Sequence, residues 1–312
     1  MSETAGAGSA TWTPTSLLQW TEGFLRGKGI DTPRLDAEVL LAHVLGCPRI
    51  NLYLQFDRPL SATELGAYRE LVRARAGRTP VAYLVGTAGF WKLTLAVSPG
   101  VLIPRPDTET LVEATLRAIA ALRERQGNPE APLTALELGT GSAAVPLAVC
   151  FETRHMRWLS VEALREACAV AAENRRRHAH LLAPRHNALN LVRGDRFAAL
   201  ASGYSPHLIV SNPPYIPSAE IPGLMPEVSQ AEPRAALDGG MDGMVFQRYL
   251  LDHAATHLPP GGRLLMEMGP EQGAPLATAA GRRPGLRVLG IHKDLAGRDR
   301  VIEVERIQNP DS

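Results

Sequence analysis

The sequence contains little cysteine, with only Cys47, Cys150 and Cys168 among 312 residues. These thiols lie too far apart in the sequence for a redox or metal-binding pair, so we expect a reducing compartment and neither disulfides nor zinc. The nine histidines also form no group with the spacing of metal ligands. The sequence therefore predicts no metal site.

An excess of charge of either sign is also missing. The chain has 33 lysine and arginine residues against 32 acidic residues, which gives a formal net charge of +1. Proteins that bind nucleic acid or acidic membranes over a broad surface usually carry a clear basic excess. The composition therefore argues against such partners and leaves open only a local basic patch.

Long hydrophobic runs are absent as well. The longest uninterrupted apolar stretch, residues 143–151, is about half as long as a membrane-spanning helix requires. Residues 1–14 are small and polar, with no basic region before an apolar one, so they do not resemble a signal peptide. We expect a flexible N-terminus over residues 1–14 and a soluble, cytoplasmic protein.

The sequence does contain enough apolar material for a large core. Hydrophobic residues make up 45% and charged residues 21%, which is ordinary for globular proteins and argues against disorder. A length of 312 residues predicts about two domains. Over residues 15–85, apolar residues recur at helical spacing between glycine and proline interruptions, which predicts four or five short helices in a small bundle.

Polar residues of this helical region carry two further expectations. Ser61 followed three residues later by Glu64 has the pattern of a helix start. Arg73, Arg75 and Arg78 are expected on a solvated face, with contact to a tRNA-shaped or acidic partner as the less favoured alternative.

The pattern changes after this region. Over residues 86–106, near-alternation of apolar residues among glycines and prolines predicts a hairpin that links two domains. From residue 107 to residue 312, strand-like and helix-like segments alternate, which is typical of an α/β domain with a mostly parallel sheet covered on both faces. Residues 293–300 are too short for a crossover helix, so the last two strands should be antiparallel. Seven strands are predicted, over residues 133–138, 157–161, 189–192, 208–210, 263–268, 286–291 and 301–304.

A glycine-rich turn follows the first predicted strand, in the sequence Glu137-Leu138-Gly139-Thr140-Gly141-Ser142-Ala143. Glycine lets the backbone approach a ligand closely, and open α/β sheets bind cofactors at the carboxyl ends of their strands. Glu162 ends the second strand about twenty residues later, where a carboxylate can accept hydrogen bonds from ribose hydroxyls. The alternatives are a turn that only starts a helix and a solvated carboxylate. Together the features favour a nucleoside cofactor, but they do not separate a nicotinamide dinucleotide from S-adenosylmethionine.

The fourth predicted strand leads into Asn212-Pro213-Pro214-Tyr215. Two prolines make the loop stiff and remove two amide donors, so its carbonyl groups can act as acceptors. An asparagine oxygen and a proline carbonyl can hold both hydrogens of an NH₂ group, while a tyrosine ring offers a flat face to a planar group. The loop therefore favours capture of a planar amino or amide nitrogen over the alternative of a structural loop with a packed tyrosine.

These motifs together resemble the S-adenosylmethionine-dependent methyltransferases of amino groups, and within them the HemK/PrmC-type glutamine methyltransferases of peptide chain release factors. The Asn-Pro-Pro-Tyr loop is shared by the wider superfamily. Residues 90–109, 232–240 and 293–301 resemble the glutamine methyltransferases in particular. The resemblance covers residues 15–306 and implies a Rossmann-like methyltransferase fold, with residues 15–85 as a helical substrate-recognition domain and residues 107–312 as the catalytic domain.

The resemblance also implies a role for individual residues. The glycine turn would lie along the methionine part of the cofactor, Glu162 would bind the ribose hydroxyls, and Asp195 would lie beside the adenine. Alanine replaces a usual glycine at 143, glutamates replace the commoner aspartates at 137 and 162, and arginine replaces a frequent aromatic residue at 196. Cofactor contacts are implied for Glu137, Gly139, Thr140, Gly141, Ser142, Ala143, Glu162, Asp195, Arg196, Phe197 and Asn212, and catalytic contacts for Asn212, Pro213, Pro214 and Tyr215.

The expected activity is methyl transfer from S-adenosylmethionine to the side-chain amide nitrogen of the glutamine in the Gly-Gly-Gln motif of a release factor. An amide nitrogen is a poor nucleophile, so the expected role of Asn212 is to orient it, and no base is assigned. A nucleobase amino-group methyltransferase of RNA or DNA and an inactive binding module of the same fold are the alternatives. A release factor is the expected partner, without direct nucleic acid or membrane contact, and a monomer is expected.

Overall fold

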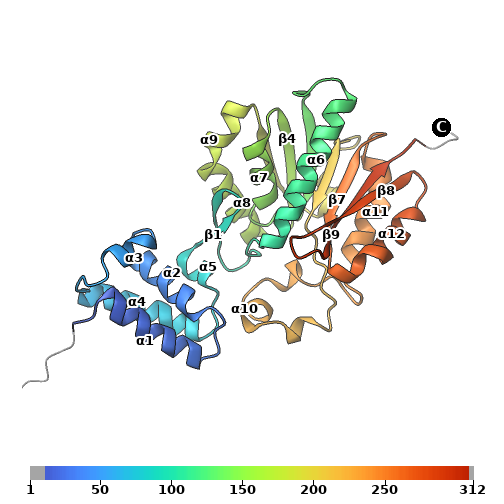
Figure 1. Cartoon of the computed structure of the whole chain (residues 1–312). Coiled ribbons are helices and arrows are strands. Elements are labelled where there is room, and N and C mark those ends of the chain that lie inside the picture. Colours follow the sequence, from blue (N-terminus) through green and yellow to red (C-terminus); the bar gives the residue numbers. More distant parts are fainter. Residues whose placement is uncertain (1–10, 309–312) are drawn as a thin grey trace, which may run out of the picture. The chain divides into compact units, whose positions relative to one another are not determined.

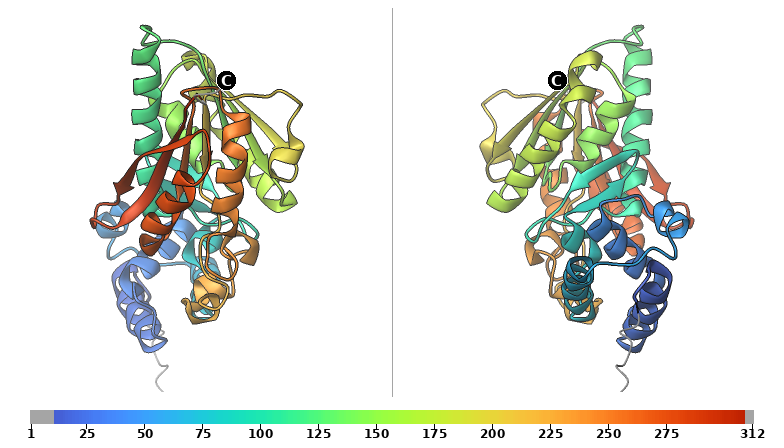
Figure 2. Two further views of the ribbon diagram at one scale, coloured as in Figure 1. Left: turned by 90° about the vertical axis from the view of Figure 1, so that its right-hand side faces the viewer. Right: turned by 90° about the vertical axis from the view of Figure 1, so that its left-hand side faces the viewer.

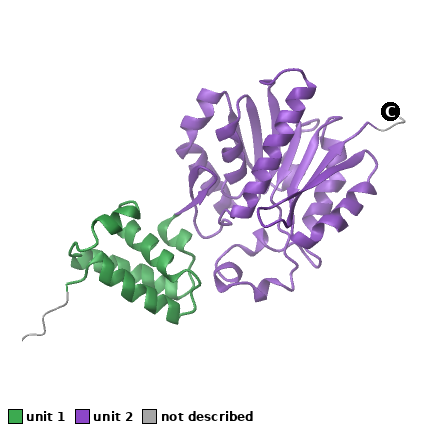
Figure 3. Ribbon diagram, viewed as in Figure 1, with its two compact units in different colours: residues 1–86 green, residues 87–312 purple. Residues whose placement is uncertain are grey.

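A computed structural model describes residues 11–308 of the chain. The chain divides into two compact units, residues 1–86 and residues 87–312 (Figure 3). The flexible N-terminus predicted for residues 1–14 lies mostly outside the described residues, and the first helix already begins at Pro14. Within the described range, every helix is too short or too polar to cross a membrane.

The first unit is a bundle of five helices, as the apolar spacing predicts (Figure 1). Capping boxes start two of them: Thr13 caps the first, and Ser61 with Glu64 caps the fourth, which confirms the predicted start. Leucines such as Leu25 and Leu40 are fully buried between the helices. The helices are α1 (Pro14–Gly27), α2 (Pro33–Leu45), α3 (Ile50–Leu54), α4 (Ala62–Ala76) and α5 (Val81–Val85).

The expectation of a solvated face is wrong for Arg75. Its Nε donates to Asp36 Oδ2 at 2.6 Å, and only 8% and 7% of the two side chains are exposed. Arg73 differs, because it is exposed and pairs with the equally exposed Glu70. The apolar pattern alone could not separate the two arginines, because Arg75 is desolvated only by the packing of α4 against α2.

The second unit begins with the predicted hairpin, β1 (Thr87–Phe90) paired antiparallel with β2 (Leu93–Ala96). Asn174 ties this hairpin to the rest of the unit. Its Nδ2 donates to the carbonyls of Ala96 and Ser142 at 2.9 Å each, and its Oδ1 accepts from the Ala96 amide at 2.6 Å. The hairpin is thereby held against the end of the glycine turn.

A seven-stranded sheet forms the centre of the second unit, in the order β5-β4-β3-β6-β7-β9-β8. The first five strands along the chain run parallel, while β9 pairs antiparallel with both β7 and β8, which confirms the predicted topology. The strands are β3 (Leu133–Leu138), β4 (Met156–Glu162), β5 (Ala188–Arg193), β6 (Leu208–Ser211), β7 (Arg263–Glu267), β8 (Leu286–Lys293) and β9 (Asp299–Arg306).

Helices cover both faces of this sheet (Figure 2). Alternate residues of β6 show the division: Leu208 and Val210 belong to the core on one face, with α6 and α7, and Ile209 belongs to the core on the other, with α11 and α12. The α-helices are α6 (Glu109–Arg125), α7 (Ala144–Glu152), α8 (Arg165–Arg177), α9 (Ala179–Leu182), α10 (Pro226–Ser229), α11 (Val245–His257) and α12 (Gly273–Gly281).

The remaining helical segments of the second unit are short 3₁₀ turns. They are η1 (Pro106–Thr108), η2 (Ala183–Arg185), η3 (Arg196–Ala199), η4 (Ile221–Gly223), η5 (Arg234–Ala236) and η6 (Pro270–Gln272).

The buried Asp36–Arg75 pair gives a stability prediction for the first unit. Asp36→Asn should remove the carboxylate charge that faces the buried arginine and destabilise the helices by about 3 kcal/mol or more. Hydrogen exchange of the α2 and α4 amides should accelerate accordingly. The matched control, Glu70→Gln, removes an exposed carboxylate and should change exchange little. Equal exchange in the two variants would contradict the energetic role of the buried pair.

Candidate active site

The parallel pairing of β3 with β6 brings two sequence motifs together. The register aligns Glu137 with Val210, so the glycine turn that follows β3 and the Asn212 loop that follows β6 leave the sheet at the same edge. Ser211 strengthens this junction, because its hydroxyl donates to the Leu138 carbonyl at 2.7 Å. The chain order reverses between these two strands, where open α/β sheets form ligand crevices.

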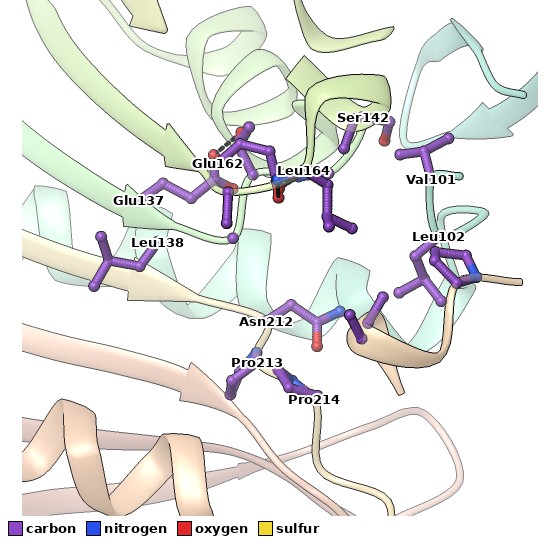
Figure 4. Close-up of a pocket in the computed structure, with 18 of the residues that line it drawn as sticks. Val101, Leu102, Glu137, Leu138, Ser142, Glu162, Leu164, Asn212, Pro213 and Pro214 are labelled. Atoms are coloured by element: carbon purple, nitrogen blue, oxygen red, sulfur yellow. Dashed lines mark hydrogen bonds between the residues drawn. The ribbon is translucent and has the colours of Figure 1, made fainter. Parts of the chain in front are cut away.

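A hollow lies at this edge, and Figure 4 draws Glu137 and Glu162 above Asn212, with Val101 and Leu102 at the right. The hollow is lined by most of the residues predicted for the site: Glu137, Gly139, Thr140, Gly141, Ser142, Glu162, Asp195, Arg196, Asn212, Pro213 and Pro214. The strands and loops that supply them are far apart in the sequence but end at one edge.

The glycine turn has the backbone that its composition suggests. Gly139 and Gly141 have φ values of 76° and 54°, in the left-handed region. A Cβ atom at Gly139 would meet no other atom within 4 Å, so it would occupy the hollow itself. Ala143 also has a positive φ, 61°, at the start of α7, which costs about 1 kcal/mol for a residue with a Cβ atom. The strained position is the one where the resemblance implied glycine in place of alanine.

Glu162 is buried and held in place by two backbone amides. The N–H of Gly141 donates to Oε2 and the N–H of Leu164 donates to Oε1, each at 2.9 Å. Each carboxylate oxygen has lone pairs left, because it accepts only one of these bonds. The side chain is therefore fixed across the glycine turn and can still accept hydrogen bonds from a ligand.

Glu137 lies deeper in the hollow, with 3% of its surface exposed. Its Oε2 accepts hydrogen bonds from the hydroxyls of Thr140 and Ser160. Burial raises the pKa of Glu137 to about 8, the two hydroxyls oppose this shift, and the nearby Glu162 carboxylate adds to it. The site thus contains a carboxyl group that is protonated at neutral pH.

Asn212 lies below these carboxyl groups in Figure 4. Its Nδ2 donates to the Thr108 hydroxyl at 3.0 Å. Its Oδ1 accepts no hydrogen bond from any residue between 11 and 308. The amide is thereby anchored at its nitrogen and offers a free acceptor oxygen.

Three predicted residues do not line the hollow. Ala143 is fully buried at the start of α7, where its methyl group packs in the core. Phe197 is buried against α11, with its ring stacked 4.2 Å from that of His257. Tyr215 is directed away from the hollow toward the end of β7, and burial together with the nearby Glu267 carboxyl raises its hydroxyl pKa. The tyrosine therefore presents no free ring face to this hollow.

Asp195 and Arg196 lie at the rim. The guanidinium of Arg196 donates to both oxygens of Asp195, at 2.8 and 3.0 Å, and also lies 4.4 Å from the ring centre of Tyr249. This ion pair lowers the pKa of the exposed Asp195 carboxyl. In this structure the Asp195 carboxylate, which was predicted to lie beside adenine, forms an ion pair with Arg196.

Residues 86–106, which were expected to form a linker, also contribute one wall of the hollow. The second half of this segment, from Gly100 to Arg105, lines the hollow together with Thr108. Both oxygens of Glu232 accept from Arg105, at 2.6 and 2.7 Å, and the Glu232 side chain is almost completely buried. The ion pair joins two of the stretches on which the family resemblance rests. Their similarity to the family was the only sequence signal for these contacts, because no spacing rule connects residues so far apart.

Comparison with known proteins identifies the family. Residues 16–86 match the family described as the PrmC N-terminal domain. The chain is 41% identical to the release factor glutamine methyltransferase of Geobacter sulfurreducens over 292 residues, which cover 93% of this chain and 96% of that protein. The chain belongs to the release factor glutamine methyltransferase family.

One further relative supports this membership, and one solved structure shares the fold. The release factor glutamine methyltransferase of Rhodopirellula baltica is 36% identical over 306 residues, which cover 98% of this chain and all of that protein. The hMettl16 catalytic domain, solved in complex with a 3′UTR hairpin, aligns with a TM-score of 0.50 at 12% identity over 70% of this chain and 77% of that chain. This second likeness shows a shared fold alone.

The glycine turn of this family member gives a binding prediction. Gly141→Asp should weaken binding of S-adenosylmethionine at least tenfold by isothermal titration calorimetry. The new side chain strains a backbone with φ of 54° and places a carboxylate beside Glu162. Gly46→Asp is the matched control, because Gly46 has a φ of 60° in the first unit. Unchanged binding by a folded Gly141→Asp variant would remove the turn from the cofactor site.

The buried Glu137 carboxyl predicts a pH effect on stability. Its pKa lies near 8 in the folded protein and near 4.5 in the unfolded chain, so its stabilising contribution is complete below 4.5 and is lost as the pH rises through 8. Glu137→Gln keeps a neutral side chain, so its melting temperature should rise relative to wild type between pH 5.5 and pH 9, without cofactor.

Glu173→Gln serves as the control for this measurement. Paired arginines lower the pKa of the exposed Glu173 to about 2, so it stays ionised throughout this range. Its melting temperature relative to wild type should be independent of pH. The same flat profile for Glu137→Gln would contradict the raised pKa.

Proposed function

We propose that this protein transfers a methyl group from S-adenosylmethionine to the side-chain amide nitrogen of the glutamine in the Gly-Gly-Gln motif of a peptide chain release factor. The single observation that carries the proposal is the free Oδ1 of Asn212, held beside the glycine turn in a chain that is 41% identical to a release factor glutamine methyltransferase. The cofactor, when bound, supplies an electrophilic methyl group on a sulfonium centre.

The residues of the hollow fit this cofactor. The backbone of the glycine turn leaves open space where a Cβ atom would lie, so a ligand can approach the main chain. Glu162 retains lone pairs for the ribose hydroxyls while two backbone amides hold it in place. The Glu162 carboxylate at the glycine turn also suits a ligand that carries positive charge on its sulfonium and ammonium groups.

Asn212 orients the substrate nitrogen in this proposal. Its Oδ1 accepts one hydrogen of the glutamine NH₂ group, and the carbonyl of Pro213 is the proposed acceptor of the second. Two fixed acceptors direct the nitrogen at the methyl group and stabilise the positive charge that grows on it during transfer. The new N–C bond forms as the C–S bond breaks, and the nitrogen then releases its surplus proton to water.

The helical unit is proposed to recognise the release factor, with support from the match of residues 16–86 to the PrmC N-terminal domain. We also propose that the protein acts in the cytoplasm as a monomer without binding nucleic acid. A net charge of +1 supports the last point, because nucleic-acid binding depends on neutralising phosphates.

The test measures methyl incorporation from labelled cofactor into purified release factor. Asn212→Ala should lower kcat about 10²-fold while leaving the dissociation constant of S-adenosylmethionine nearly unchanged, since only the substrate contact is lost. Asn190→Ala, at an exposed asparagine of β5, is the matched control and should retain wild-type turnover.

Substrate variants decide the substrate class. A release factor with alanine in place of its Gly-Gly-Gln glutamine should accept no label, and bulk RNA and DNA should remain unlabelled. Label that persists in the altered factor would reject the glutamine assignment. Label that enters nucleic acid instead would establish the nucleobase activity.

A further inference from the structure

Glu267 is a buried carboxyl group that the proposed mechanism does not use. It is the last residue of β7 and has no exposed surface. Neither of its oxygens makes a hydrogen bond within normal distance and angle limits to any described residue. Burying a carboxyl group without a hydrogen-bond partner costs folding free energy, so we expect such a group to have a role.

The sheet register places this group at the active-site edge. The pairing of β6 with β7 aligns Ser211 with Met266, so the residues that follow, Asn212 and Glu267, occupy the same level of neighbouring parallel strands. Glu267 therefore lies directly behind the Asn212 loop. Its position follows from the same topology that builds the cofactor hollow.

Two hydroxyl groups and two charged groups surround the carboxyl. Burial raises the pKa of Glu267 to about 7, and the nearby hydroxyls of Thr108 and Tyr215 lower it, as does the charge of Arg300. Asp107 has the opposite influence, although its carboxylate pairs with Arg300 at 3.0 Å. Neither hydroxyl forms a hydrogen bond to Glu267 within normal distance and angle limits in this structure.

The hydrogen-bond balance of Thr108 connects Glu267 to Asn212. The Thr108 hydroxyl accepts a bond from Asn212 Nδ2 at 3.0 Å, so its own hydrogen must be donated elsewhere. A hydroxyl whose hydrogen pointed at Asn212 would favour the opposite orientation of the amide, with its NH₂ group toward the substrate. An acceptor behind Thr108 removes this alternative.

We infer that Glu267 is a positioning residue whose carboxylate accepts the Thr108 hydroxyl hydrogen and thereby holds Asn212 with Oδ1 toward the substrate nitrogen. This inference rests on the proposed function, because it assumes that Asn212 binds the substrate amide. The chain Glu267–Thr108–Asn212 acts on the orientation of the Asn212 amide. Tyr215, in the same surroundings, offers the carboxylate a second hydroxyl donor.

The test compares variants along this chain in the full-length enzyme. Glu267→Leu and Thr108→Val should each lower kcat for a release factor about 10²-fold, the scale of a misplaced reacting group, with little change in KM or in the affinity for S-adenosylmethionine. The double variant should be no slower than either single variant, since both remove the same constraint. Glu267→Gln and Thr108→Ser keep the acceptor and the hydroxyl, so each should be at least tenfold faster than its apolar counterpart.

Controls separate orientation from folding. Glu271→Leu, at an exposed glutamate close in sequence, should have wild-type turnover. Melting temperature and cofactor affinity report whether Glu267→Leu folds. If it does not fold, the comparison of Thr108→Val with Thr108→Ser tests the inference. Additive losses in the double variant, or equal turnover of Thr108→Val and Thr108→Ser, would overturn the inference.

Asn212→Ala distinguishes this inference from the proposed function. If Asn212→Ala turns over as fast as wild type, the role of Asn212 in the proposed function fails, and the positioning role fails with it. If Asn212→Ala is slow while folded Glu267→Leu and Thr108→Val are fast, only the positioning role fails.

Discussion

Parallel hydrogen bonding between β3 and β6 is the constraint on which the active site depends. It brings the glycine turn and the Asn212 loop to one edge, and the next pairing, β6 with β7, adds Glu267 at the same level. A shift of one residue in either register would reverse which side chains face the two cores. The apolar residues on both faces of β6 therefore also hold the functional loops in place.

The three buried glutamates at this edge of the sheet differ in their hydrogen-bond partners. Glu162 accepts hydrogen bonds from two backbone amides. Glu137 accepts hydrogen bonds from two hydroxyls and has a pKa of about 8. Glu267 accepts no hydrogen bond within normal limits from the described residues, and its pKa is about 7. Burial disfavours charge at Glu137 and Glu267, and the neighbouring hydroxyls partly offset this effect. Side chains of one type can thus have different hydrogen-bond partners at one edge of the sheet.

The sequence predicted the elements well because their signals are local. Helical spacing defined the first unit, the Ser61 cap was visible from two residues, and the short segment before β9 required an antiparallel pair. Most of the residues predicted for the site line one hollow, since the loops after parallel strands share an edge. Arg75 could not be placed this way, because its burial depends on the distant Asp36.

Periodicity, loop length and glycine placement were sufficient to predict a glycine turn after β3, an acidic residue at the end of β4 and the Asn212 loop after β6. Only the tertiary structure showed that Tyr215 turns toward Glu267, that Arg105 pairs with Glu232, and that Thr108 anchors Asn212. The reason is physical. Local patterns determine backbone conformation, whereas the direction and partners of a polar side chain depend on which other groups burial brings within hydrogen-bonding distance.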